Sequence, residues 1–166
     1  ITAILVSLLS PVLGALSDVG GYRKWIMMGS TWLCVGATAL LFFPQEGQVL
    51  MALTLFVLAN VTFEFGTVFC SAYLPEITSE ERLGRASGFA WGLGYVGGLM
   101  ALGLALVLLV QPDAPVFGFS TENGENIRAT NLLVALWFFL FSIPTFLWVK
   151  DRKPEKGALR QSVNSS

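Results

Sequence analysis

The chain has 166 residues, of which 54% are hydrophobic and 13% charged, and its mean hydropathy is +0.68. Soluble domains carry about 25% charged residues, so this composition excludes a soluble globular domain, a disordered tail and a small disulfide-stapled module. The formal net charge of −1 argues against nucleic-acid binding, and the absence of histidine excludes Ser–His–Asp catalysis and histidine-ligated metal sites.

Five apolar runs are predicted to cross a lipid bilayer as α-helices, because a hydrocarbon core about 30 Å thick needs roughly 20 apolar residues in a helix. None of the runs alternates apolar and polar residues as the strands of a membrane barrel do. The predicted fold class is therefore all-α, a multi-pass transmembrane helical bundle. The runs cover residues 1–17, 25–43, 48–74, 86–110 and 129–149.

The two ends of the chain differ in character. The chain opens without Met inside the first apolar run, with no basic segment before that run and no cleavage site after it. A signal peptide would have both features, so we expect a fragment of a longer protein that starts within its first helix. The polar segment 150–166 is expected to be a cytoplasmic linker or tail.

Basic residues predict the orientation of the bundle. Nine of the ten Lys and Arg residues lie between the first two runs, between the third and fourth, or after the fifth, while Arg128 stands alone on the other side. Cytoplasmic connections carry an excess of Lys and Arg, so these three segments are placed in the cytoplasm. The expected location is the cytoplasmic membrane of a bacterium, with a vacuolar membrane as the alternative.

The first cytoplasmic connection carries a pattern of glycines and charges formed by Gly14, Asp18, Gly21, Arg23 and Lys24. Asp18 follows the end of a helix, where the helix dipole disfavours an anion, so it needs a cation or the N-terminus of another helix. Arg23 is close enough in sequence to serve. The same residues also fit an ordinary tight turn with basic anchors, and their spacing leaves both interpretations open.

This pattern resembles the signature loop between the second and third helices of the major facilitator superfamily. The resemblance implies that the five runs are helices two to six, within the N-terminal half of a transporter. It also implies that Asp18 and Arg23 belong to a cytoplasmic charge network that stabilises the outward-facing state. Further transmembrane helices of the same chain would then be partners of this fragment.

A second stretch resembles the vacuolar-effluxer-like branch of that superfamily, whose yeast members are linked to autophagy and amino-acid efflux. This resemblance implies a small solute as substrate, with an exported amino acid as the finer expectation. Cys70 and Ser71 depart from the aromatic–Asn pair expected at that place. The resemblance rests on Phe63–Phe65, Val68–Phe69, Ala72–Glu76, Glu81–Trp91 and Leu93–Gly98.

The third run carries a polar stripe made of Asn60, Glu64, Thr67 and Ser71. At 100° per residue these side chains fall within a sector of about 60° on one helix face. An ionised carboxylate inside a membrane costs several kcal/mol unless it is paired or hydrated. We therefore predict that Glu64 couples transport to a proton or cation, or binds a substrate amine. The alternative is a structural Glu bonded to a neighbouring helix or to the cytoplasmic gate.

The fourth run is rich in glycine, with Gly88 and Gly92 four residues apart and Gly94 and Gly98 likewise. Such spacing is typical of close helix packing, although a direct role toward substrate stays open. The letters Gly92-x-Gly94-x-x-Gly97 match a dinucleotide loop, but no strand precedes them. Just before this run, Arg82 and Arg85 are expected to act as a cytoplasmic gate or as solvated membrane anchors.

Together these features predict secondary active transport of a small solute by alternating access, coupled to a proton gradient and without a cofactor. The sequence has no nucleotide-binding motif, no pair of aspartates within neighbouring runs and no metal-spaced cysteines, so we expect no enzyme. Two alternatives remain, namely a non-transporting membrane scaffold and a permease of the same superfamily for sugars or drugs.

Overall fold

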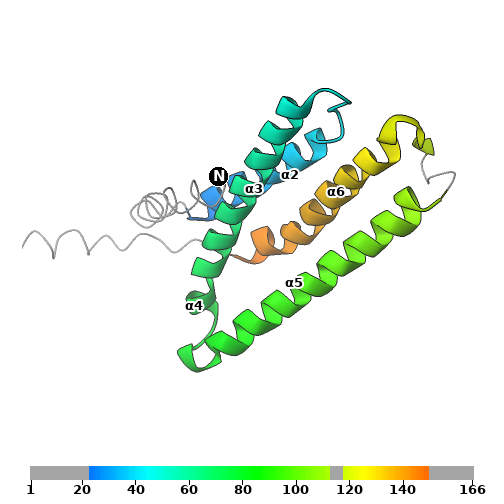
Figure 1. The fold of residues 1–166 in the computed structure, drawn as a ribbon. Helices are drawn as coiled ribbons and strands as arrows, with labels where there is room; N and C mark the ends of the chain where they lie inside the picture. Colours follow the sequence, from blue (N-terminus) through cyan, green and yellow to red (C-terminus); the bar gives the residue numbers. More distant parts are fainter. Residues whose placement is uncertain (1–22, 113–117, 150–166) are drawn as a thin grey trace, which may run out of the picture.

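The computed structural model describes residues 23–112 and 118–149, and this part of the chain is helical without a strand (Figure 1). The all-α prediction is confirmed. The first predicted run, with Gly14, Asp18 and Gly21, and the tail 150–166 lie outside the described residues. The elements are α2 (Arg23–Leu40), α3 (Val49–Ala72), α4 (Leu74–Ile77), η1 (Glu80–Arg82), α5 (Leu83–Ala105), η2 (Leu106–Val110), η4 (Glu122–Gly124) and α6 (Glu125–Trp148).

Three helical segments of the described part are long and apolar enough to cross a membrane. They are α3, the continuous stretch Glu80–Val110 that contains α5, and α6. The helix α2 has 18 residues and begins with Arg23 and Lys24, and it is not among the three. That α2 also crosses the membrane therefore stays a prediction.

The observed helix ends differ by a few residues from the predicted ones. Helix α2 ends at Leu40, although the apolar run continues to Phe43, and tight turns follow in which Phe42 and Phe43 bond to carbonyls three residues back. Pro44 has no N–H to donate to the carbonyl of Leu40 and disfavours helical backbone at Phe43, so the helix cannot continue through this segment. Helix α6 begins at Glu125, four residues before the predicted apolar run, with Gly124 in a left-handed conformation at φ 64° as its N-cap.

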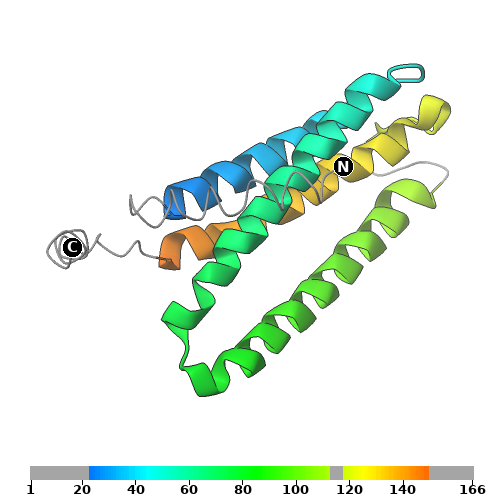
Figure 2. The same cartoon turned by 60° about the vertical axis from the view of Figure 1, so that its left-hand side comes forward.

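Helix α2 packs against both α3 and α6 (Figures 1 and 2). Ala59, Thr62, Phe65 and Phe69 recur on one face of α3 and are buried. The core cluster joins Met27, near the start of α2, to Phe65, Phe69 and Tyr73.

Helix α5 stands apart from the others along much of its length. Figure 2 shows α3 and α5 diverging from the short connection that contains α4. The residues that α5 and η2 bury are Ala101, Ala105 and Leu109, all in the half near α6's start, whereas the half from Leu83 to Val96 buries none. α5 therefore packs against the rest of the described bundle mainly through the end near the start of α6, and a groove lies beside its other half.

Gly66 of α3 is expected to limit how closely α2 can approach. A Cβ atom at this position would lie 3.7 Å from Oγ1 of Thr31 in α2, which is ordinary van der Waals contact. We expect Gly66→Ala to keep the thermal unfolding temperature in detergent, while Gly66→Leu lowers it by several degrees, since overpacking costs about 1–3 kcal/mol. Equal unfolding temperatures for the two variants would contradict this contact.

Candidate functional site

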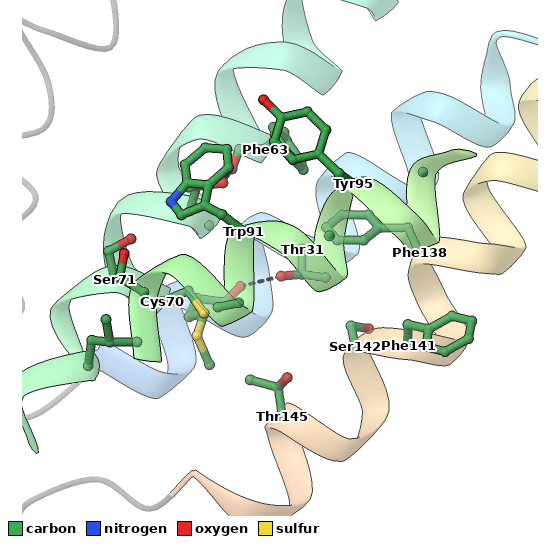
Figure 3. Close-up of a pocket in the computed structure, with 18 of the residues that line it drawn as sticks. Thr31, Phe63, Cys70, Ser71, Trp91, Tyr95, Phe138, Phe141, Ser142 and Thr145 are labelled. Atoms are coloured by element: carbon green, nitrogen blue, oxygen red, sulfur yellow. Dashed lines mark hydrogen bonds between the residues drawn. The ribbon is translucent and has the colours of Figure 1, made fainter. Parts of the chain in front are cut away.

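A groove of about 710 Å³ lies between α3, α5 and α6, and Met27 and Thr31 of the first half of α2 also line it (Figure 3). Most of its wall is apolar, and none of the described residues that line it is charged. Its aromatic side chains come from three helices and are Phe63, Trp91, Tyr95, Phe138, Phe141 and Phe146. Its hydroxyl and thiol side chains are Thr31, Thr62, Thr67, Cys70, Ser71, Ser87, Ser142 and Thr145.

Several hydroxyl groups of the groove already donate to their own helix. Thr31 donates to the carbonyl of Met27 at 2.9 Å, and Thr62 donates to that of Leu58 at 2.7 Å. Ser142 makes the same kind of bond at 2.8 Å. A hydroxyl that donates to the preceding turn keeps its lone pairs free, so these side chains offer acceptors to a ligand. The groove therefore suits an apolar ligand that carries a few hydrogen-bond donors.

Only two of the four residues in the polar stripe that the sequence predicted on α3 line the groove. Thr67 and Ser71 line the groove, whereas Asn60 and Glu64 do not. Asn60 donates its side-chain amide to the carbonyl of Phe56 at 2.9 Å, one turn back on the same helix. At 100° per residue Asn60 lies between Thr67 and Ser71 in angle, so it is outside the groove because it lies further along α3, whereas Glu64 lies at the edge of the sector.

Glu64 lies on the side of α3 that faces away from α2. Its position differs by roughly 140° or more from that of Thr62 and Phe69, which face α2, at 100° per residue. The side chain is exposed, and no described residue bonds to its carboxylate. Glu64 follows the start of α3 by 15 residues, or roughly 22 Å at 1.5 Å per residue, which is inside the predicted span. A bare carboxylate at this depth is costly, so we expect a hydrated cavity or a partner beyond the described residues.

The predicted gate residues are only partly described. Arg82 and Arg85 are exposed at the connection between α4 and α5, on the side assigned to the cytoplasm. Lys24 is half-buried in the first turn of α2. Because Asp18 lies outside the described residues, the charge network of the first loop stays a prediction.

The four α5 glycines predicted to pack against another helix have no close neighbour on another helix of the described structure. A Cβ atom at Gly88, Gly92, Gly94 or Gly98 would have no neighbouring atom within 4 Å, although Gly94 and Gly98 do line the groove. Gly97, in contrast, would lie 4.0 Å from the Trp137 indole nitrogen of α6. Close packing on the four glycines stays a prediction, and any partner for them lies outside the described residues.

Sequence reasoning missed the aromatic wall of the groove. Trp91 and Tyr95 stand one turn apart on α5 with their ring centroids separated by 6.3 Å, and both face the groove (Figure 3). Phe138 and Phe141 approach from α6. The spacing of four residues between Trp91 and Tyr95 is visible in the sequence, but it does not show which helix lies opposite.

Comparison with known proteins identifies the family. Residues 1–164 match the Major Facilitator Superfamily. The chain belongs to this superfamily. The resemblance expected from the first cytoplasmic loop is thereby confirmed, and the helices of Figure 1 are part of an integral membrane protein.

Relatives within the superfamily differ in how much of the chain they match. An uncharacterised transporter of Bacillus subtilis is 28% identical over 154 residues, which is 92% of this chain and 35% of that protein. An autophagy-related protein 22-1 of Emericella nidulans is 29% identical over 68 residues, covering 41% of this chain and 10% of the relative. The class C tetracycline resistance protein of Escherichia coli is 30% identical over 133 residues, covering 75% and 31%.

The chain thus spans about a third or less of the length of these relatives. No solved structure matches it significantly. Membership of the major facilitator superfamily supports transport in general, while the solute, the coupling ion and the direction are not given by these relatives.

Proposed function

We propose that this chain belongs to the N-terminal half of a secondary transporter that moves a small solute by alternating access. In such proteins two halves rock about a substrate site near the middle of the membrane. The observation that carries the proposal is the match of residues 1–164 to the major facilitator superfamily. The hydroxyl-bearing groove between the helices and the exposed carboxylate of Glu64 on α3 are polar features of otherwise apolar helices.

The finer proposal is efflux of an amino acid driven by a proton gradient. Glu64 carries the one carboxylate within the predicted spans, and a carboxylate can hold either a proton or the amine of an amino acid. Similarity to fungal autophagy-related proteins supports the same substrate class, as does the sequence pattern around Phe63 and Glu64. Arg82 and Arg85, with Asp18 and Arg23 of the first loop, would close the cytoplasmic side.

A drug permease is the second candidate. The groove is lined by aromatic side chains and by no charged described residue, which suits a large apolar solute better than a zwitterion. The similarity to a tetracycline resistance protein supports this candidate. For either candidate we propose the bacterial cytoplasmic membrane as the location, with the vacuolar membrane as the alternative.

The test uses the full-length protein reconstituted in liposomes with an imposed pH gradient. We expect gradient-dependent flux of at least one component of a labelled amino-acid mixture, several-fold above protein-free liposomes. Labelled tetracycline is measured in parallel. Flux of tetracycline without flux of any amino acid would support the drug permease instead, and flux of neither would remove both substrate proposals.

A further inference from the structure

The first turn of α6 carries two polar side chains that reach other helices. Asn126 is 6% exposed, and its side-chain amide donates to the carbonyl of Leu109 at 3.0 Å. Leu109 lies in the π-helical turn η2 that ends α5, and it is 3% exposed. The bond joins residues 17 positions apart across the connection between these two helices.

This bond has a clear physical reason at the end of α5. The last carbonyls of a helix have no partner within that helix, and a buried carbonyl needs a donor. The amide of Asn126 supplies such a donor from α6. The backbone around Asn126 is held in turn, because its own N–H donates to the carbonyl of Ser120 at 3.0 Å and Glu125 accepts from the N–H of Ser120 at 3.0 Å.

Arg128 contacts the turn that follows α2. Its Nη1 donates to the carbonyl of Pro44 at 3.4 Å, and its guanidinium lies 6.0 Å from the ring centre of Phe42. Both residues belong to the segment that follows the C-terminus of α2, where the helix dipole favours a cation. Pro44 is buried. This arrangement gives a specific role to the one basic residue that stands apart from the cytoplasmic clusters.

We propose that Asn126 and Arg128 form an interhelical polar junction, in which Asn126 caps the C-terminal end of α5 and Arg128 binds the turn that follows α2 through the carbonyl of Pro44. The junction holds the start of α6, the end of α5 and the turn that follows α2 as one unit. Among the residues that the structure describes, no side-chain hydrogen bond joins the half of α5 from Leu83 to Val96 to α3 or α6. The junction therefore fixes this end of α5 relative to α6, and the groove lies beside the other part of α5. This role does not depend on which solute is carried.

Each half of the junction has its own expected signature in amide hydrogen exchange. The full-length protein is placed in lipid nanodiscs, and exchange is followed by mass spectrometry in the segments 41–48 and 106–111. Loss of one buried hydrogen bond corresponds to about a fivefold change in a local opening equilibrium. We expect Asn126→Leu to speed exchange about fivefold in 106–111 and to leave 41–48 unchanged. Arg128→Gln is expected to do the reverse.

Matched variants separate this junction from a general loss of stability. Asn131→Leu makes the same change one turn further along α6, and we expect exchange in both segments to match the parent protein. Arg128→Lys keeps the cation and is expected to restore part of the protection of 41–48. If Asn126→Leu does not fold, Asn126→Ser is measured in its place. Unchanged exchange in both variants, or equal acceleration of both segments by each variant, would overturn the proposal.

Discussion

Replacing Glu64 by Gln is expected to abolish gradient-driven transport by the full-length protein while its fold stays intact. Gln has nearly the same shape as Glu, but it carries neither a proton nor a charge. Removing a costly charge from a membrane span should leave the unfolding temperature unchanged or raise it. If Glu64 couples flux to protons, Glu64→Gln should lower gradient-dependent flux by roughly tenfold or more and remove its dependence on pH.

The matched control is Glu46→Gln, which makes the same chemical change at an exposed position between α2 and α3. We expect its flux and pH dependence to equal those of the parent protein. Unaltered coupled flux in Glu64→Gln would rule out the coupling role. Unaltered flux together with a lower unfolding temperature would support the structural alternative, in which Glu64 bonds to a neighbouring helix.

Enlarging the groove-lining glycines of α5 is expected to destabilise the full-length protein in proportion to side-chain size. No described atom lies within 4 Å of a Cβ atom built at Gly94 or Gly98. Their four-residue spacing nevertheless predicts a close helix contact, which must come from outside the described residues. We expect Gly→Ala at either position to be tolerated and Gly→Leu to lower the unfolding temperature by several degrees, at a cost of about 1–3 kcal/mol.

The measurement is thermal unfolding of each purified variant in detergent, with transport measured in parallel. Val96→Leu, an exposed change of similar hydrophobicity on the same helix, serves as the control and is expected to have no effect. If Leu is tolerated as well as Ala at both glycines, these positions face lipid or open space. The packing role would then be wrong.

Much of the secondary structure could be predicted because membrane helices follow simple rules of length and polarity. The runs 48–74, 86–110 and 129–149 correspond to α3, to α5 with η2, and to α6. Their ends were less predictable, since hydropathy does not detect polar helical turns. Glu125, Asn126 and Arg128 look like loop residues by polarity, yet they form the first turn of α6.

The candidate site was predictable only in part. Helical period placed Thr67 and Ser71 on the same sector as Glu64, and that much follows from geometry alone. Which of these side chains meet the groove depends on the positions of α5 and α6 along and around α3, and the period of α3 does not encode those positions. For the same reason the contribution of Trp91 and Tyr95 to the groove could not be predicted from their spacing.

The sequence by itself determined that this protein is an α-helical membrane protein of the major facilitator superfamily. Composition, run length and a local loop pattern suffice for this, because each reflects contacts with lipid and water or residues adjacent in the chain. Only the tertiary structure decided that Glu64 faces away from α2, and that Arg128 reaches the carbonyl of Pro44, 84 residues earlier. Such contacts arise from the packing of helices distant in sequence, where shape and unsatisfied carbonyl groups, rather than local pattern, select the partners.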